Sequence, residues 1–267
     1  MADFHRGFED VDRSADQQLF FKFLDLAGTL PSTAKYRERM LELCPTGYGS
    51  TVLDIGCGLG SEATRIARLV GKAGMVYGVD ASEALIAEAR RRTRELDLPL
   101  QFQVCDAHAL TFKDESFDVC RAERVLLYLE NPATAVLEMA RVTRPGGQAI
   151  IFDFDYGARF IDSDFATMTR HIEALLASEP RNPAIGRELP HLMRKAKLKI
   201  DAVEPMTLLT TVAIARRIYA AALSKGIKTG VFTAIDVEAW WREQEAMEQD
   251  GRFLHAQHGY IAAASKP

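Results

Sequence analysis

The chain has 267 residues, 48% of them hydrophobic and 26% charged, which is enough for one domain with a full hydrophobic core. Its formal net charge of −4 at pH 7 argues against a general nucleic-acid binder, because such proteins are usually basic. The four cysteines include no C-x-x-C pair and the histidines lack metal-ligand spacing, so we expect reduced thiols in a cytoplasmic protein and no metal. No apolar run approaches about 18 residues, so no membrane span is predicted, and the polar start of the chain predicts no signal peptide.

Helical patterns precede the first predicted strand. Apolar residues recur at helical spacing over residues 19–27 and again over 36–44, and a proline follows each pattern. We therefore expect residues 1–48 to form a helical cap in front of the rest of the fold.

From residue 51 onward, short apolar runs alternate with helical patterns. The first five strands are predicted near residues 51–55, 75–79, 100–104, 117–121 and 148–154. Two further strands are predicted at 199–209 and 253–264. This alternation is typical of the Rossmann-like α/β class, in which a mostly parallel sheet carries crossover helices on both faces.

A glycine-rich turn follows the first predicted strand. Gly56, Gly58 and Gly60 stand at alternate positions before a helical pattern, and Asp80 ends the next strand at the place of a ribose-binding acid. The spacing G-x-G-x-G differs from the G-x-G-x-x-G of nicotinamide enzymes. Asp54 precedes the glycines and would repel a pyrophosphate, but it suits a cationic ligand. A nicotinamide-dependent oxidoreductase is therefore disfavoured.

The stretch V-L-D-I-G-C-G-L-G resembles motif I of the class I S-adenosylmethionine-dependent methyltransferases. The segments G-V-D-A-S (78–82), V-C-D-A (104–107) and F-D-V-C-R (117–121) resemble the later motifs of that family, in order and at family spacing. The resemblance covers residues 49–154. It implies S-adenosylmethionine as cofactor, S-adenosylhomocysteine as product, and a seven-stranded sheet whose last, antiparallel strand lies beside the fifth.

The resemblance also assigns roles to single residues. Asp54 would organise the methionine end of the cofactor, Asp80 would hold the ribose hydroxyls, and Asp106 would accept from the adenine amino group. The other expected cofactor contacts are Tyr36, Arg37, Gly56, Cys57, Gly58, Gly60, Ala81, Cys105, Ala107, Ala122 and Glu123. Plainer interpretations stay open, because Asp54 and Asp80 would also serve as helix caps. Glu123 would equally pair with its neighbour Arg124.

The remainder of the chain is expected to complete one domain spanning residues 1–267. Residues 49–154 form its cofactor-binding core, 155–186 and 212–250 are helical insertions that act as a lid, and 187–211 and 251–267 complete the sheet. Asp155, Tyr156 and His171 are candidate general bases, although a solvated strand end and an ordinary histidine explain Asp155 and His171 equally well. Methyl transfer is an in-line displacement from an activated donor, so a base is optional.

The sequence favours a small-molecule methyltransferase similar to bacterial enzymes of quinone and natural-product metabolism. A lid rich in Phe, Met and Leu suits an aromatic or partly apolar acceptor, and Phe4, Phe8 and Phe20 are candidates to line its pocket. We expect a monomer or homodimer without nucleic-acid or membrane partners. Two alternatives stay open: a cofactor-binding enzyme with a non-methylating reaction such as cyclisation, and a non-enzymatic regulator.

Overall fold

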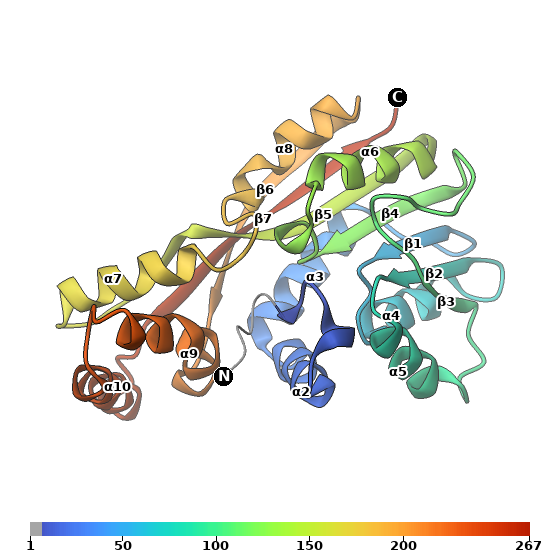
Figure 1. The fold of residues 1–267 in the computed structure, drawn as a ribbon. Helices are drawn as coiled ribbons and strands as arrows, with labels where there is room; N and C mark the ends of the chain where they lie inside the picture. Colours follow the sequence, from blue (N-terminus) through green and yellow to red (C-terminus); the bar gives the residue numbers. More distant parts are fainter. Residues whose placement is uncertain (1–6) are drawn as a thin grey trace.

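A seven-stranded sheet forms the centre of the molecule, which a computed structural model describes over residues 7–267 (Figure 1). The strands are β1 (Thr51–Ile55), β2 (Met75–Asp80), β3 (Leu100–Val104), β4 (Phe117–Glu123), β5 (Thr143–Ile161), β6 (Lys199–Leu209) and β7 (His255–Ser265). Their order is β3-β2-β1-β4-β5-β7-β6. Neighbours from β3 to β5 are parallel, whereas β7 is antiparallel to both β5 and β6. The predicted Rossmann-like fold and the antiparallel last strand beside β5 are confirmed.

Helices connect the strands and cover both faces of the sheet. They are α2 (Gln17–Gly28), α3 (Pro31–Leu43), α4 (Ser61–Val70), α5 (Glu83–Thr93), α6 (Pro132–Val142), α7 (Ala166–Ala177), α8 (Ile185–Lys195), α9 (Val212–Lys228) and α10 (Ala234–Gln249), with short 3-10 turns η1 (Val11–Arg13) and η2 (Leu126–Tyr128). The chain runs outward from β1 to β3 and then returns to β4 on the other side of β1. This reversal of strand order is where open α/β sheets bind their ligands.

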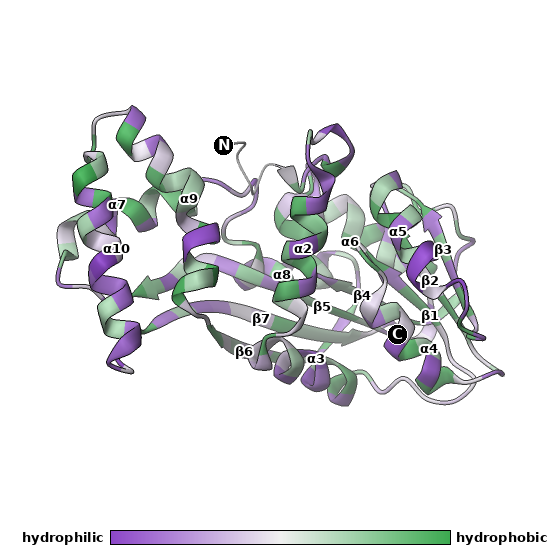
Figure 2. Cartoon of the chain, turned by 90° about the horizontal axis from the view of Figure 1, so that it is seen from below, coloured by the Kyte–Doolittle hydropathy of each residue, from purple (hydrophilic) through white to green (hydrophobic). Residues whose placement is uncertain are grey.

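Two hydrophobic cores lie on opposite faces of the sheet. Val52 packs in a cluster with residues of α3, α4 and α5, whereas the next residue, Leu53, packs with residues of α6 and α8. Successive side chains of a strand point to opposite faces, so a sheet covered on both sides needs apolar residues at both positions. The helices around it show apolar and polar stretches in alternation (Figure 2).

Strand β5 is longer than the sequence predicts. It spans Thr143–Ile161 rather than 148–154, so residues 155–161 continue the sheet instead of opening a lid insertion. The extension is stabilised by β7, because Phe160 and Ile161 pair with Ala256 and His255 beyond an irregularity that follows Asp155. The predicted end of this strand at residue 154 is therefore wrong.

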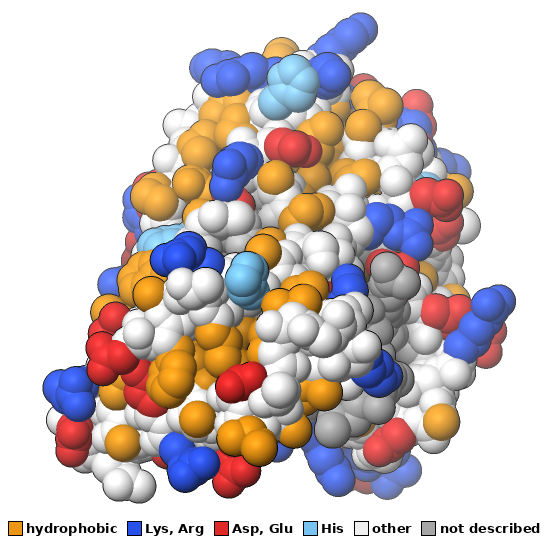
Figure 3. Space-filling view, turned by 60° about the vertical axis from the view of Figure 1, so that its left-hand side comes forward, with side chains coloured by type: hydrophobic (Ala, Val, Ile, Leu, Met, Phe, Trp, Pro, Cys, Tyr) orange, Lys and Arg blue, Asp and Glu red, His pale blue; other side chains and the backbone are white. Residues whose placement is uncertain are grey.

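Helices α7, α9 and α10 gather at the far end of the extended β5–β7–β6 ribbon and share a small core of their own (Figure 1). In this core Trp240 is fully buried and donates from Nε1 to Oγ1 of Thr169 at 2.9 Å, which ties α10 to α7. Charged side chains of both signs are interspersed with apolar ones on the side that Figure 3 shows. No helix within residues 7–267 is both long and apolar enough to cross a membrane.

Candidate active site

A cavity of about 640 Å³ lies over the carboxyl ends of β1 to β4 and reaches along the β5–β7–β6 ribbon. This volume is within the range of small-molecule sites, roughly 300–1,000 Å³. The predicted cofactor residues that line it are Arg37, Asp54, Gly56, Cys57, Gly58, Asp80, Ala81, Cys105, Asp106, Ala107 and Glu123. Tyr36, Gly60 and Ala122 are not among the residues that line the cavity.

The glycine turn after β1 has a backbone conformation that residues with a side chain rarely adopt. Gly56 and Gly60 have φ angles of 67° and 75°. A Cβ at Gly56 would lie 2.2 Å from Val125, and one at Gly60 would lie 2.4 Å from the ring of Phe102. Both the left-handed backbone and the close packing therefore require glycine. The turn brings bare backbone to the cavity at Gly56 and Gly58.

Asp80 lies at the end of β2 and fixes the glycine turn. Its two carboxylate oxygens accept from the backbone N–H of Gly58 at 2.9 Å and of Ser82 at 3.0 Å. Burial raises the pKa of Asp80, against the effect of these backbone donors. Asp80 does not cap α5, because Ser82 is the N-cap and accepts from Leu85 N–H at 3.1 Å. The cap interpretation of Asp80 is therefore wrong.

The N-terminal segment closes the cavity beside Asp80. Asp12, in η1, accepts from the hydroxyl of Ser82 at 2.6 Å and from the backbone N–H of Glu83 and Ala84 at 2.8 and 3.0 Å. A carboxylate at this position suits the positive end of the α5 dipole. Burial alone would raise the pKa of Asp12, but the hydrogen bonds outweigh it and lower that pKa. The sequence patterns do not reveal this contact.

Asp106 follows β3 and is held by the histidine two residues later. One carboxylate oxygen accepts from the backbone N–H of His108 at 2.9 Å and lies 2.6 Å from its Nδ1. The side chain of Asp106 is 62% exposed, so it can reach a ligand in the cavity. The neighbouring thiols line the cavity too. For Cys57, burial and the charges of Asp80 and Asp54 raise the pKa well above its usual value, which keeps this thiol neutral.

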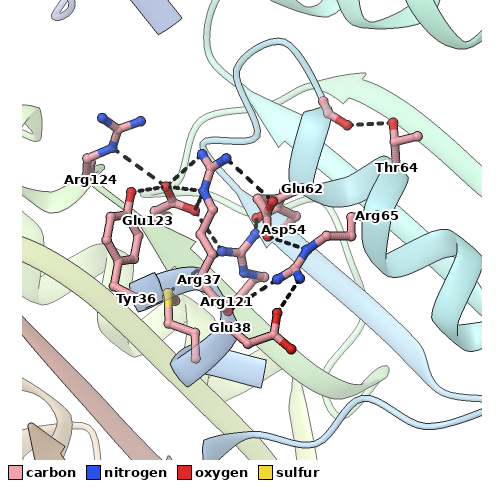
Figure 4. A network of polar contacts seen from close by, with 12 residues as sticks. Tyr36, Arg37, Glu38, Asp54, Glu62, Thr64, Arg65, Arg121, Glu123 and Arg124 are labelled. Carbon is pink, nitrogen blue, oxygen red and sulfur yellow. Dashed lines mark hydrogen bonds and ion pairs between the residues drawn. The ribbon is translucent and has the colours of Figure 1, made fainter. Parts of the chain in front are cut away.

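A buried ionic network lies at the mouths of β1 and β4 (Figure 4). Arg121 donates from Nη1 to Asp54 at 3.1 Å and from Nη2 to Glu123 at 2.9 Å. Glu123 also accepts from Arg37 at 2.9 Å and from the Tyr36 hydroxyl at 2.5 Å. Three arginines, with Arg124 as the third, thus surround the Glu123 carboxylate, and they include a residue, Arg121, that sequence reasoning missed.

The pKa values of the two acids in this network, Asp54 and Glu123, shift in opposite directions. Burial raises the pKa of Asp54 to about 6, with Arg121 opposing this effect. Burial alone would raise the pKa of Glu123 as well, but Arg37, Arg121 and Arg124 outweigh it and hold that pKa well below its usual range. Glu123 is therefore the permanent negative charge at this end of the cavity. Asp54 lines the same cavity and is paired with Arg121, so arginines hold both acids of the network.

Arg124 and Tyr36 shape the wall of the network. Arg124 has a φ of 58°, an uncommon conformation for a residue with a side chain, and its Nε lies 3.7 Å from Glu123. The predicted Glu123–Arg124 pair thus exists, but Arg37 and Arg121 lie closer to the carboxylate. Tyr36 is fully buried and stacks on Phe152 with ring centroids 4.1 Å apart. Its ring packs in the core while its hydroxyl faces the site.

The three candidate bases lie in different surroundings. Asp155 is buried under the guanidinium of Arg187 and accepts from the Gly157 N–H, away from the cavity. His171 lies on the exposed face of α7 and does not line the cavity. Tyr156 does line it, and burial raises the pKa of its phenol, so the hydroxyl stays protonated. The structure therefore brings only one of the three to the site.

The far end of the cavity is formed by residues that sequence reasoning did not select. Arg159 and Gln257 come from β5 and β7, and Ile214 and Ile218 come from α9. Phe8 lines the cavity, Phe20 packs in an N-terminal cluster with Val11 and Leu85, and Phe4 lies outside the described residues. Within residues 7–267, no group of three or more His, Cys, Asp and Glu side chains is placed to hold a metal ion.

Comparisons with known proteins agree with this geometry. A protein-family model described as a methyltransferase domain matches residues 47–212. The ubiquinone/menaquinone biosynthesis C-methyltransferase UbiE of Bdellovibrio bacteriovorus is 33% identical over 119 residues, which cover 45% of this chain and 50% of that protein. The chain spans about half the length of the first curated relatives that it matches, 54% and 50%.

Two solved structures illustrate the likeness in fold. Phosphoethanolamine N-methyltransferase 2 of Haemonchus contortus, in complex with S-adenosyl-L-methionine, superposes with a TM-score of 0.62 at 18% identity, covering 99% of this chain and 60% of that one. The 4+2 cyclase SpnF superposes with a TM-score of 0.57 at 23% identity, covering 88% and 81%. At these identities the two structures show the shared fold alone.

Proposed function

This chain belongs to the class I S-adenosylmethionine-dependent methyltransferases, and on that premise we propose that it transfers a methyl group from S-adenosylmethionine to a small organic acceptor. The observation that carries the proposal is the position of Asp80. Its carboxylate anchors the Gly58 turn and lines the same cavity as Asp54, Asp106 and Glu123. Four acids at the ends of four neighbouring strands suit a donor that carries a sulfonium, an ammonium and a ribose diol.

The residues present fit S-adenosylmethionine. The bare backbone of the glycine turn leaves room for the donor, since a Cβ at Gly58 would meet only Leu24, at 3.6 Å. We propose that Asp80 binds the ribose hydroxyls and that Asp106 and Ala107 contact the adenine. At the methionine end, Arg37 would face the carboxylate and Glu123 the ammonium, which matches each charged group with its opposite.

The protein's part in catalysis is alignment and exclusion of water. The donor supplies an activated methyl group and leaves as the neutral thioether of S-adenosylhomocysteine. The chain therefore needs no nucleophile of its own, and holding two reactants in line accounts for much of the rate. The N-terminal segment, bound at Ser82 through Asp12, covers the cavity and limits access of water.

We propose an aromatic or partly apolar acceptor. The lining of the cavity also includes large apolar side chains, among them Phe23, Leu24, Phe154, Ile214 and Ile218. Tyr156 is the candidate that would contact the acceptor, as a neutral hydrogen-bonding phenol. Asp155 and His171 stay outside this proposal because neither lines the cavity.

Titration calorimetry with S-adenosylmethionine, S-adenosylhomocysteine and NADH tests the donor, and only the first two are expected to bind. Incubation with methyl-labelled donor and a fractionated metabolite extract tests transfer. Donor binding without transfer to any fraction would instead favour the alternatives, a non-methylating enzyme such as a cyclase or a cofactor-binding regulator. We further propose a cytoplasmic monomer or homodimer, in keeping with the four free cysteines, and light scattering tests the oligomeric state.

A further inference from the structure

Arg159 is a buried cation in the wall of the cavity. It lies on the extended part of β5, is 7% exposed and lines the cavity. Its guanidinium stands over the ring of Tyr156, 4.6 Å from the centroid, and 5.6 Å from the centroid of Tyr219. Both rings contact the guanidinium as cation–π partners.

One edge of the guanidinium is fixed by Gln257. Nη1 of Arg159 donates to Oε1 of Gln257 at 3.0 Å. The Gln257 amide group is fixed in turn, because its Nε2 donates to the carbonyls of Asp155 and His258 at 3.1 and 3.0 Å. Its oxygen must therefore face Arg159. This arrangement orients the guanidinium without neutralising it, because an amide carries no charge.

The other edge of the guanidinium has no well-placed acceptor. Among residues 7–267, no group meets hydrogen-bond geometry with Nε or Nη2 of Arg159. The Tyr219 hydroxyl interacts with Arg159, which opposes the rise in the pKa of that phenol, but the hydroxyl carries no charge. Glu173 is near enough for Arg159 to affect its pKa, but its carboxylate accepts from the backbone N–H of Ile161 at 3.0 Å. The charge of Arg159 therefore lacks a paired counter-ion.

The aromatic and imidazole neighbours of Arg159 carry no negative charge. Burial raises the pKa values of the Tyr156 and Tyr219 phenols, so both stay protonated. Burial and the charge of Arg159 lower the pKa of His255 to about 3, so this imidazole stays neutral. Nε2 of His255 is buried without a hydrogen-bond partner, and the Tyr219 hydroxyl is buried with no partner in good hydrogen-bond geometry. Uncharged polar atoms thus surround the cation.

The Nε–Nη2 edge of other arginines in this chain binds carboxylates. Arg39 binds the two oxygens of Glu204 through Nε and Nη2 at 2.7 and 2.6 Å, and Arg91 binds Glu88 in the same way at 2.6 and 2.7 Å. This fork matches an anion with two oxygens. The ligand that would accept from Nε and Nη2 of Arg159 is therefore an oxyanion that enters through the cavity.

We infer that the methyl acceptor is an organic anion, and that Arg159 binds its carboxylate or phosphate group. The inference rests on the proposed function and narrows its substrate class. Because Nε and Nη2 are shielded from solvent, binding requires the guanidinium to turn this edge toward the cavity that it already lines. The apolar body of the acceptor would then lie along Phe154, Ile214 and Ile218, between the anion and the donor.

Binding of simple probes to the protein saturated with S-adenosylhomocysteine tests the inference. The probes are 4-hydroxybenzoate, phenyl phosphate and the uncharged 4-hydroxybenzamide, measured by titration calorimetry. At least one anion is expected to bind about tenfold or more tightly than the amide, as a charge-assisted hydrogen bond allows. The preferred anion distinguishes a carboxylate from a phosphate. Equal affinities, or no binding of either anion, would overturn the inference.

Three variants assign the preference to Arg159. Arg159→Gln should abolish it, and Gln257→Glu should weaken it by providing an internal counter-ion while the arginine stays in place. Arg242→Gln is the control, because Arg242 lies on α10, is 66% exposed and does not line the cavity. Unchanged affinity for S-adenosylhomocysteine shows that each variant is folded. A preference that survives Arg159→Gln in a folded protein contradicts the assignment.

Transfer itself gives an independent readout. Protein, methyl-labelled donor and a metabolite extract are incubated, and the products are separated on an anion exchanger at pH 8. Labelled product retained by the resin supports an anionic acceptor, and labelled product found only in the unretained fraction overturns it. An absence of any labelled product contradicts the proposed methyl transfer instead, and the probe titrations then decide the anion site alone.

Discussion

Asp54 on β1 and Arg121 on β4 stand directly opposite each other in the sheet, and their side chains form a buried ion pair of 3.1 Å. Both side chains are only 4% exposed. Arg121 also pairs with Glu123, so a single guanidinium compensates an acid on each of two neighbouring strands. A buried charge is tolerated when it is paired, and its partner then becomes indispensable.

Replacing Arg121 with methionine should therefore destabilise the protein strongly. The substitution leaves Asp54 and Glu123 buried without their shared partner, and we expect the free energy of unfolding to fall by about 3–5 kcal/mol. Urea unfolding at pH 7.5 measures this change. Arg94→Met is the matched control, since Arg94 is 71% exposed and its loss should change the free energy by about 0.5 kcal/mol or less. Similar losses in both variants would show that the network contributes little.

Sequence patterns predict the acids of the site but not the arginines that hold them. Asp54 and Asp80 follow apolar runs and flank a glycine turn, so their position is a local property of the chain. Arg121 stands inside an apolar strand, where neither alternation nor a motif distinguishes a core arginine from an edge residue. Its role depends on which strand becomes the neighbour of β1, and this is decided by the whole fold.

Sequence patterns do not predict the cavity residues on the extended part of β5 for a related reason. The irregularity after Asp155 shifts the register of β5, so the period-two pattern that runs from Asp153 does not carry through to Arg159. The extension itself depends on pairing with β7, almost a hundred residues later in the chain. His171, a candidate because of its chemistry alone, lies on the exposed face of α7, a helix that contributes no residue to the cavity lining.

Asp80→Ala should weaken donor binding. If Asp80 binds the ribose hydroxyls, its loss leaves them unpaired in a site that excludes water, at a cost of about 1–3 kcal/mol in binding free energy. Titration with S-adenosylmethionine measures the loss, and Asp97→Ala is the control because the Asp97 side chain is 95% exposed. An affinity unchanged by Asp80→Ala, in a protein whose unfolding curve is preserved, would remove Asp80 from the ribose site.

Asp12→Ala should loosen the N-terminal segment. The carboxylate accepts from Ser82, Glu83 and Ala84 at the start of α5, and losing such a cap costs about 0.5–2 kcal/mol. Amide hydrogen exchange should therefore become faster at Glu83 and Ala84, and the affinity for S-adenosylmethionine should fall as the wall opens. Asp16→Ala is the control, because Asp16 is exposed, makes no side-chain cap hydrogen bond and does not line the cavity. Equal exchange in both variants would mean that the segment is held by its apolar contacts.

Asp153 predicts a pH dependence of stability. It is fully buried on β5, and burial raises its pKa to about 7 from 3.8, although the backbone N–H groups of Phe154 and Leu127 oppose this. Between about pH 4 and pH 7, the Asp153 carboxyl is therefore protonated in the folded protein and ionised in the unfolded chain. The contribution of Asp153 to stability is fully present below about pH 4 and is lost as the pH rises to about 7.

Asp153→Asn isolates this contribution. The amide oxygen can still accept a backbone hydrogen bond, but it does not titrate, so the free energy of unfolding should fall less between pH 5 and pH 8 in the variant than in the wild type. Urea unfolding at both pH values measures the difference. Parallel pH profiles of the two proteins would show that Asp153 titrates alike in the folded and unfolded states.

A comparison of Gly60 with Gly251 distinguishes two reasons for glycine in a turn, the left-handed backbone and the lack of space for a Cβ. Both have a left-handed backbone, with φ of 75° and 69°, so alanine at either position is strained by roughly 1–2 kcal/mol. Only Gly60 is also crowded, because its Cβ would lie 2.4 Å from Phe102, whereas nothing lies within 4 Å of a Cβ at Gly251. Gly60→Ala should therefore lower the free energy of unfolding clearly more than Gly251→Ala, and it should also weaken donor binding by displacing the start of α4. Equal losses of stability in urea would mean that Phe102 moves aside freely and that backbone strain alone selects glycine in this turn.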